Sequence, residues 1–235
     1  MDFTTKDFLQ LLKVSASVAL LSTASISSHA QWLGQDYATY GVPQVNYAAN
    51  SFLNFSVLNN ASEEAAAETS TIAPRTGKST VAADLAARYT GADRAQLTKV
   101  FTDSLANFEQ VTNRLGLPND DVASALAAFL VGNYIAMHGT SLPPDEEFVA
   151  LTAHLRTALA SSPQFVESTP AQKRQAYEQL AMMGMFMTTA RLALAQTPNP
   201  KAETHFRNHA KANLEQLLNR PADTLEIKGG QVSLH

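Results

Sequence analysis

The sequence predicts an all-α protein: an antiparallel bundle of five to six helices with two buried central helices, followed by a short C-terminal β-hairpin. Two observations predict the bundle. Between residues 79 and 218, apolar residues recur at three- and four-residue spacing, which is typical of helices with a buried face. Signals that start or end a helix interrupt this pattern repeatedly. Because the connections are short, we expect consecutive helices to pack as antiparallel neighbours.

The composition describes one ordinary globular domain with additional sequence. The chain has 235 residues, of which 45% are hydrophobic and 16% are charged, and its formal net charge is −4. Single domains commonly have about 100–200 residues. The chain has 17 basic and 21 acidic residues, and the basic residues are not clustered in the sequence, so we expect no nucleic-acid partner. The absence of Cys excludes disulfides, thiolate metal sites and cysteine nucleophiles.

Residues 1–30 have the three parts of a secretory signal peptide. Lys6 and Lys13 precede a short apolar stretch at 14–26, and Ala30 ends a small-x-Ala cleavage signal. We therefore expect an exported protein, periplasmic or secreted. The apolar stretch is shorter than the ~20 residues that a membrane span needs, so we interpret it as part of the signal peptide and not as a span. We expect no stable membrane span after cleavage.

Residues 31–78 are predicted to form a flexible, low-complexity arm. The segment lacks helical periodicity and is rich in Asn, Ser and Thr, so it buries too little apolar surface to offset its ordering entropy. It nevertheless carries six aromatic residues: Trp32, Tyr37, Tyr40, Tyr47, Phe52 and Phe55. Aromatic residues on a mobile segment can order on a partner, so the arm is the expected contact with another envelope or secreted protein.

Residues 79–220 form the predicted helical domain. Local start and end signals place its helices. In order, they are a short helix at about 80–89, one at about 92–115 ended by Gly116, a third capped by Asn119, a fourth opening at 143–146, a fifth opening at Thr169 and Pro170, and a sixth opening at Asn199 and Pro200.

The third and fifth helices are expected at the centre of the bundle. No charged residue occurs at 122–137 in the third or at 179–190 in the fifth. A helix that is apolar on every side is buried on every side. Small residues on the two helices permit a close approach of their backbones: Ala128, Gly132, Ala181 and Gly184.

Residues 221–235 form the predicted tail with the hairpin. Leu225, Ile227, Val232 and Leu234 alternate with polar residues around the pair at 229–230, two glycines typical of a tight hairpin turn. An isolated hairpin is marginal in water, so we expect it to pack on the bundle.

One weak candidate metal site lies on the sixth helix. His205 and His209 are four residues apart, so both rings can face one way. A zinc-protease motif would place Glu after the first His, where this chain has Phe206. Two ligands without a third favour a solvated helix face, and we expect no cofactor.

Methionines raise a second metal hypothesis. The fifth helix carries Met182, Met183, Met185 and Met187, and thioethers are ligands for Cu(I). Helical geometry places them on two separate faces, which favours core filling instead.

Polar residues on the two central helices form a candidate buried network. Asn133, Tyr134 and His138 lie on the third helix, and Tyr177 and Gln179 lie on the fifth. Buried polar groups need hydrogen bonds, so the expected role is to fix helix register. The alternative is a ligand pocket between the helices.

The chain resembles a known family in its central helix. The run at 121–134 contains the pattern LAAF-x-x-GNY, preceded by Leu-Gly-Leu-Pro at 115–118 and followed by the methionine-rich run at 177–186. These segments resemble a family of uncharacterised exported bacterial proteins with a domain of unknown function. The resemblance covers about residue 92 to the C-terminus. It implies a bacterial source and an exported helical domain, and it supplies no catalytic residues.

The sequence favours a non-enzymatic binding or structural module of the envelope or secretome. No catalytic set converges, and His138 is the only imidazole on the two central helices. The alternative is a small-ligand or metal carrier that uses the space between the helices or the pair His205 and His209. An enzyme would need an open cleft with two titratable groups in reach of each other.

Overall fold

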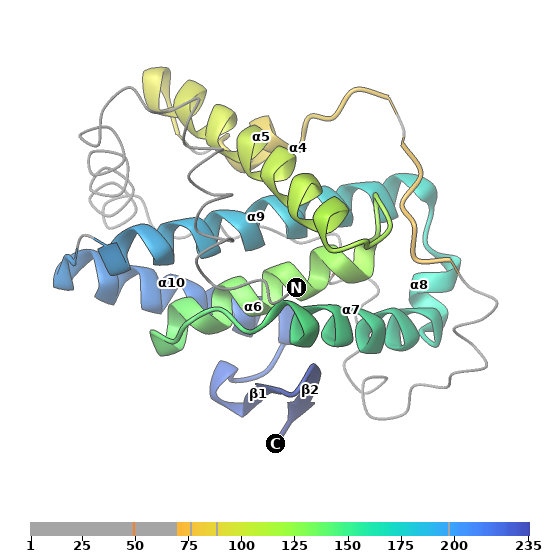
Figure 1. Cartoon of the computed structure of the whole chain (residues 1–235). Helices are drawn as coiled ribbons and strands as arrows, with labels where there is room; N and C mark the ends of the chain where they lie inside the picture. The colour runs from red at the N-terminus through yellow and green to blue at the C-terminus, as the bar shows by residue number, and fades with distance from the viewer. Residues whose placement is uncertain (1–48, 50–69, 76, 88, 197) are drawn as a thin grey trace.

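The computed structural model describes residues 49, 70–75, 77–87, 89–196 and 198–235. The expected signal peptide and most of the expected arm lie outside these residues. Within them, the chain forms seven α-helices and a C-terminal two-stranded hairpin (Figure 1). The predicted fold class is confirmed.

The helices follow the predicted order with one addition. Their bounds are α4 (Val81–Leu85), α5 (Gly91–Arg114), α6 (Val122–His138), α7 (Asp145–Ala160), α8 (Pro163–Glu167), α9 (Pro170–Gln196) and α10 (Pro200–Leu218). The addition is α8, whose five residues are too few to show a helical period.

The start of α6 differs from the prediction. We expected Asn119 as the cap, but Asp121 caps the helix, and its carboxylate accepts a hydrogen bond from the backbone N–H of Ala123 at 3.2 Å. Asp120 adopts a left-handed backbone conformation with φ of 59°. The chain therefore turns into the helix two residues later than the Asn suggested.

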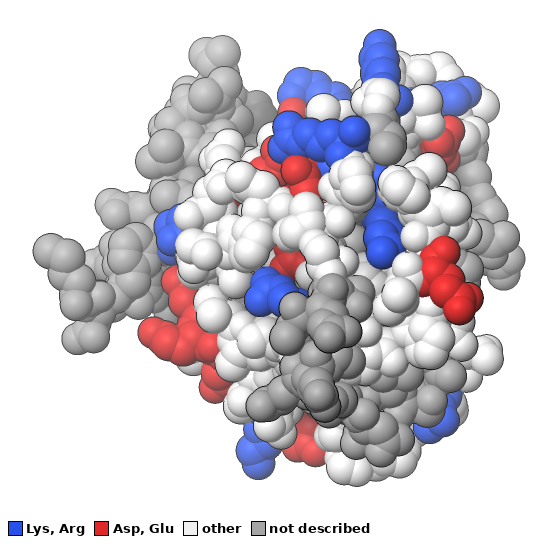
Figure 2. Space-filling model, turned by 90° about the vertical axis from the view of Figure 1, so that its right-hand side faces the viewer, with Lys and Arg blue, Asp and Glu red and all other residues white. Residues whose placement is uncertain are grey.

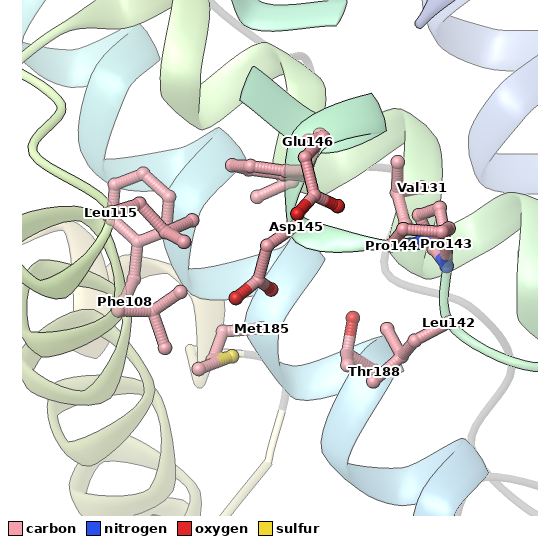
Figure 3. Close-up of a pocket in the computed structure, with 13 residues that line it drawn as sticks. Phe108, Leu115, Val131, Leu142, Pro143, Pro144, Asp145, Glu146, Met185 and Thr188 are labelled. Atoms are coloured by element: carbon pink, nitrogen blue, oxygen red, sulfur yellow. The ribbon is translucent and has the colours of Figure 1, made fainter. Parts of the chain in front are cut away.

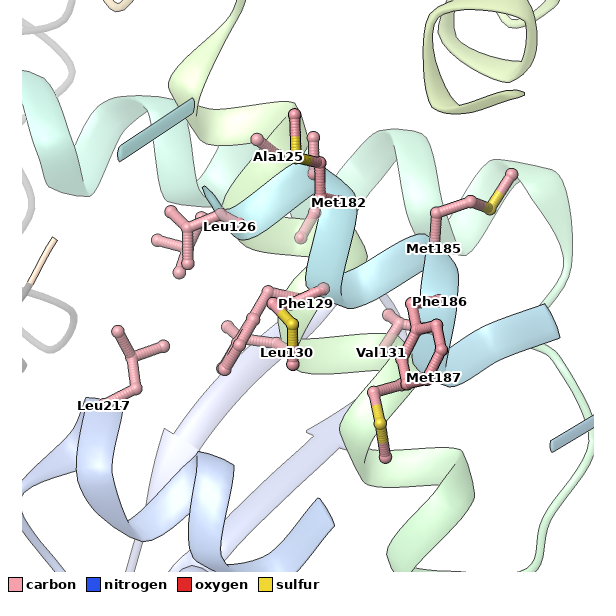
Figure 4. Packing of buried hydrophobic residues seen from close by; sticks show 14 of the residues in the cluster. Ala125, Leu126, Phe129, Leu130, Val131, Met182, Met185, Phe186, Met187 and Leu217 are labelled. Atoms are coloured by element: carbon pink, nitrogen blue, oxygen red, sulfur yellow. The ribbon is translucent and has the colours of Figure 1, made fainter. Parts of the chain in front are cut away.

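Helices α6 and α9 form the centre of the bundle. In α6, 14 of 17 residues are buried, and α9 is buried almost continuously over its middle. Side chains of the two helices interdigitate, and Leu217 of α10 packs beside them (Figure 4). The absence of charged residues at 122–137 and at 179–190 is thus explained by burial on all sides.

The two central helices run in the same direction, whereas consecutive helices are antiparallel (Figure 1). Gly184 of α9 faces Ala128 and Phe129 of α6, and Gly132 faces Gly184 and Thr188. A Cβ at Gly184 would lie 2.5 Å from backbone atoms of α6. The absence of side chains at these glycines is what lets the two backbones meet.

The other long helices cover this pair. α5 packs mainly on α9, α7 packs on α6, and α10 packs on both central helices. Each presents an apolar stripe inward, such as Leu97, Phe101 and Phe108 of α5. No helix of the described residues combines the length and apolar character that a membrane span needs.

The predicted hairpin is formed by β1 (Leu225–Lys228) and β2 (Gln231–Leu234), after a 3-10 turn at Ala222–Thr224. Ile227 pairs with Val232 across the antiparallel strands. The hairpin packs on α7, where a Cβ at Gly230 would lie 2.4 Å from the Cβ of Ala150. This packing supplies the support that an isolated hairpin lacks.

The last part of the expected arm packs on the helical domain. Thr71 and Ala73 are buried, with exposed fractions of 2% and 1%. Ile72 forms a β-bridge with Asp121, and the backbone N–H of Val122 donates to the carbonyl of Thr71 at 3.0 Å. The folded domain therefore includes residues before 79.

Candidate functional site

A pocket of about 370 Å³ lies between α5, α6, α7 and α9 (Figure 3). This volume is within the usual range for small-molecule sites, roughly 300–1,000 Å³. Its walls are mostly apolar. They are formed by Phe108, Val111 and Leu115 of α5, Ala128 and Val131 of α6, Leu142, Pro143 and Pro144 of the following loop, Phe148 of α7 and Met185 of α9.

The pocket lies between two outer helices that pack on different central helices. α5 packs mainly on α9 and α7 packs on α6. The side chains of α5 and α7 therefore leave part of the space between the two helices unfilled. Ala128 contributes just a methyl group to the wall at this point. The sequence pattern of each outer helix predicts an apolar inner face. It does not predict that the inner faces of α5 and α7 are separated by a pocket.

Contacts at both ends of the α6–α7 loop hold the pocket in shape. Gly139 ends α6 in a left-handed conformation, and Arg191 of α9 donates to its carbonyl at 2.7 Å. At the other end, Arg114 Nη2 of α5 lies 3.5 Å from Asp145 Oδ2 of α7. These contacts connect the α6–α7 loop to α9 and connect α5 to α7.

Three polar residues line the pocket: Asp145, Glu146 and Thr188. The first two belong to the first turn of α7, where negative charge is stabilised by the helix dipole. Asp145 extends from α7 toward α9, where the Thr188 hydroxyl points back toward it (Figure 3). A mainly apolar site with few polar groups is suited to hold and orient a small molecule.

A second group of polar residues joins the segment at 70–80 to the bundle. Asp121 has an exposed fraction of 0% and accepts hydrogen bonds from Thr71 Oγ1 at 2.6 Å, Ser124 Oγ at 2.8 Å and Arg156 Nη2 at 2.6 Å. A buried carboxylate is stable only when it is paired in this way. This group is structural, because its members satisfy one another.

Asp120 continues this group toward solvent. It accepts from Arg75 Nε at 2.9 Å and from Arg174 Nη1 at 2.6 Å. Burial by itself raises the pKa of Asp120, but the hydrogen bonds from the two arginines outweigh it and hold the pKa below its usual value. Arg174 also donates to Glu178, which accepts from Ser79.

On the side of the molecule seen in Figure 2, basic and acidic side chains lie next to one another among uncharged ones. Such a mixed face suits mutual pairing of charges. It differs from the single-sign field that attracts a charged macromolecule.

Tyr177, a member of the candidate polar network, lies in the core of the bundle. Its ring packs edge-on against Phe108, with centroids 6.0 Å apart, and the Arg174 guanidinium lies 5.0 Å from its centroid. Burial is the main cause that raises the pKa of Tyr177, and the nearby Glu109 and Asp120 add to it. The phenol is therefore kept neutral.

Asn133 is the residue of that network whose partners are clearest. It is fully buried, and its amide donates to the carbonyl of Phe129 at 2.8 Å. Asn213 of α10 donates to its Oδ1 at 2.9 Å. This bond fixes α10 against α6, and sequence analysis missed its second partner because Asn213 stands in an ordinary amphipathic helix.

The other network candidates occupy separate places. Tyr134 is half-buried and stacks on His138, with ring centroids 4.3 Å apart. His138 is the last residue of α6 and is exposed, so it does not lie in the core as we expected. Gln179 is buried in α9.

In the part of the chain that the structure describes, no third metal-ligating side chain joins the histidine pair. His205 is half-buried and His209 is buried, both on α10. No group of three or more metal-ligating side chains occurs there. The four methionines of α9 are buried in the core, and Met185 also lines the pocket.

Sequence analysis missed the pocket although it named several of its residues. Residues 143–146, which include Asp145 and Glu146, were interpreted only as the start of a helix, and Ala128 only as a small residue that permits close packing. The alternative of a ligand site between helices was the nearest prediction. The sequence does not show between which helices a space remains, because an unfilled volume depends on how the helices pack.

Comparisons with known proteins identify a family but no activity. A family model described as "Family of unknown function (DUF6683)" matches residues 18–235. The match is wider than the resemblance seen in the sequence, because it includes the arm. No curated protein and no solved structure matches the chain. Since the model spans nearly all of the sequence, the chain belongs to this family of unknown function.

Proposed function

We propose that this protein is a binding protein that holds a small, mainly apolar molecule in the pocket between α5, α6, α7 and α9. The pocket itself carries the proposal: about 370 Å³ lined mainly by apolar side chains from four helices, with three polar residues among the lining. An apolar ligand would gain about 25 cal/mol for each Å² of apolar surface removed from water.

The proposal is tested with the fluorophore N-phenyl-1-naphthylamine, which is uncharged at neutral pH and brightens in apolar sites. We expect saturable binding to the purified protein. Ala128→Phe places a ring in the pocket and is expected to abolish that binding. Leu142→Trp fills the same space from the loop, and it serves if the first variant does not fold as judged by circular dichroism.

The matched control is Ala153→Phe, which adds the same ring to an exposed position of α7 outside the pocket. It is expected to bind the probe like the unmodified protein. Equal probe binding by folded Ala128→Phe and Leu142→Trp would show that the pocket is not the site, and absence of binding by the unmodified protein would refute the proposal directly.

We also propose that the protein is exported from a bacterial cell. The support is the signal-peptide pattern of residues 1–30. The test is N-terminal sequencing of the mature protein from fractionated cells, where cleavage after Ala30 leaves Gln31 first. Recovery of the intact N-terminus from the cytoplasm would contradict it.

A partner protein for the segment at 31–69 is a further proposal. It is supported by the aromatic content of that segment and by the anchoring of Thr71 and Ala73 on the bundle, which fixes where the segment ends. Deletion of 31–48 keeps the buried Ala49 and the anchor at Thr71 and Ala73, and it removes four of the six aromatic residues, so it tests the proposal without removing a core residue. If every protein captured from an envelope extract were still captured after the deletion, the segment would not be the contact.

A further inference from the structure

The charged residues that line the pocket are all acidic. They are Asp145 and Glu146, and no Lys, Arg or His is among the lining residues. The remaining walls are apolar apart from Thr188. A ligand in this pocket therefore meets apolar surface over most of its body and carboxylates at the N-terminal end of α7.

The negative charge at this end is only partly compensated. The first turn of α7 carries Asp145, Glu146 and Glu147. Opposing them are Arg114, 3.5 Å from Asp145, and the helix dipole, which is equivalent to about half a positive charge. More than one unit of negative charge remains at the start of α7.

Thr188 provides a second, independent observation. It has an exposed fraction of 7% and lines the pocket from α9, with its hydroxyl turned toward the start of α7 (Figure 3). Its Oγ1 also lies beside Gly132 of α6, where an added Cβ would meet it at 2.8 Å. A hydroxyl that lines a pocket can accept a hydrogen bond from a ligand N–H or O–H.

We propose that the pocket selects amphipathic amines, which rests on the proposed function. The apolar part of the amine lies among Phe108, Val131 and Met185. Its ammonium group lies at the Asp145 and Glu146 carboxylates, and the Thr188 hydroxyl accepts one of its N–H groups. Hydrogen bonds with an ionised donor and acceptor are stronger than neutral ones, and like charges repel an anionic ligand.

The test is competition against N-phenyl-1-naphthylamine by three ligands with the same chain length and different head groups: octylamine, octanol and octanoate. Octylamine is expected to displace the probe at a concentration about tenfold lower than octanol. Octanoate is expected to be the weakest competitor. Raising the salt concentration should reduce the advantage of octylamine over octanol, because salt screens exposed charges.

Variants at the carboxylates locate the effect. Glu146→Gln removes a charge that lines the pocket, and Asp145→Asn removes the one that faces Arg114. Each is expected to reduce the preference for octylamine over octanol while octanol still displaces the probe. Glu147→Gln removes one charge from the same turn of α7 but from a residue outside the lining, so it should keep most of the preference.

The two proposals fail in different ways. If octylamine, octanol and octanoate compete equally, or if Glu146→Gln and Asp145→Asn leave the preference unchanged, the amine proposal is wrong while the pocket remains a binding site. If the unmodified protein does not bind the probe and none of the three ligands raises its melting temperature, both proposals are wrong.

Discussion

The hydroxyl of Thr71 donates a hydrogen bond of 2.6 Å to Oδ1 of Asp121, fifty residues further along the chain. The same carboxylate caps α6 and pairs with Arg156 of α7. One buried side chain therefore connects the segment before the bundle, a central helix and an outer helix.

This connection predicts the effect of Thr71→Val. The substitution keeps the shape of the side chain and removes the donor, so the buried Asp121 loses one of its partners. We expect the free energy of unfolding to fall by about 1.5–3 kcal/mol, as for hydrogen bonds to charged groups. Urea denaturation measures the change. Thr102→Val, at an exposed position of α5, is the control and should change stability by less than about 0.5 kcal/mol.

Asp120 predicts a loss of stability in acid. Its pKa in the folded protein lies below the usual value, because the hydrogen bonds from Arg75 and Arg174 outweigh the effect of burial. A carboxyl group with a lowered folded pKa contributes stability above its unfolded pKa, near 3.9, and this contribution is lost as the pH falls through the folded pKa. Asp120→Asn should therefore reduce the difference in unfolding free energy between pH 6 and pH 3.

Asn suits this test because it tolerates the left-handed backbone of Asp120. Asp103→Asn, in an exposed pair with Lys99, is the control and should preserve the pH dependence. Burial also lowers the pKa of His154, so stability falls as the pH drops below about 6.5, where the unfolded chain binds a proton more readily; this effect is the same in Asp120→Asn and in the unmodified protein. A pH profile unchanged by Asp120→Asn would mean that its ion pairs contribute nothing in solution.

Gly184→Ala should be destabilising although it lies inside a helix. Helix propensity alone predicts a gain of about 1 kcal/mol for this substitution. The new Cβ would lie 2.5 Å from backbone atoms of Ala128 and Phe129, which cannot move aside independently. We expect an overpacking cost of up to about 3 kcal/mol to exceed this gain and to leave a net loss of about 1–2 kcal/mol, measured as a lower melting temperature and a lower urea midpoint. A more stable variant would contradict the close contact of α6 and α9.

Asn133 and Asn213 should be coupled energetically. The Asn213→Ala substitution removes the donor to Asn133 Oδ1 in a fully buried site. A double-mutant cycle with Asn133→Ala is expected to give a coupling of about 1 kcal/mol. The pair Asn133→Ala and Thr102→Val lies on separate contacts and should be additive within about 0.5 kcal/mol. Additivity in the first cycle would remove the role assigned to this hydrogen bond.

The sequence was informative where the determining interactions are local. Pro170 and Pro200 begin α9 and α10, and Asn199 caps α10 by accepting from the backbone N–H of Ala202 at 3.1 Å. The cap at Asn119 was wrong by two residues, because three neighbouring polar residues offer the same signal. Asp121 serves as the cap because Thr71 and Arg156 hold its carboxylate in place, and neither is near it in sequence.

The candidate site shows the same division. The apolar faces of α5 and α7 and the acidic start of α7 are readable from residue type and spacing. Whether those faces touch or stand apart depends on where α6 and α9 place the outer helices. The sequence does not distinguish Thr188 from the other polar residues of α9, and only the pocket identifies it as a lining residue.

The sequence by itself determined that the protein is helical, where most helices begin, which two are central and where the hairpin turns. These properties depend on periodicity and on contacts within about four residues. Only the tertiary structure decided that the central helices run in the same direction, that residues before the bundle complete the cap of α6, and that four helices enclose a pocket. These depend on contacts between residues far apart in the chain, such as Gly132 with Gly184, Thr71 with Asp121 and Arg114 with Asp145.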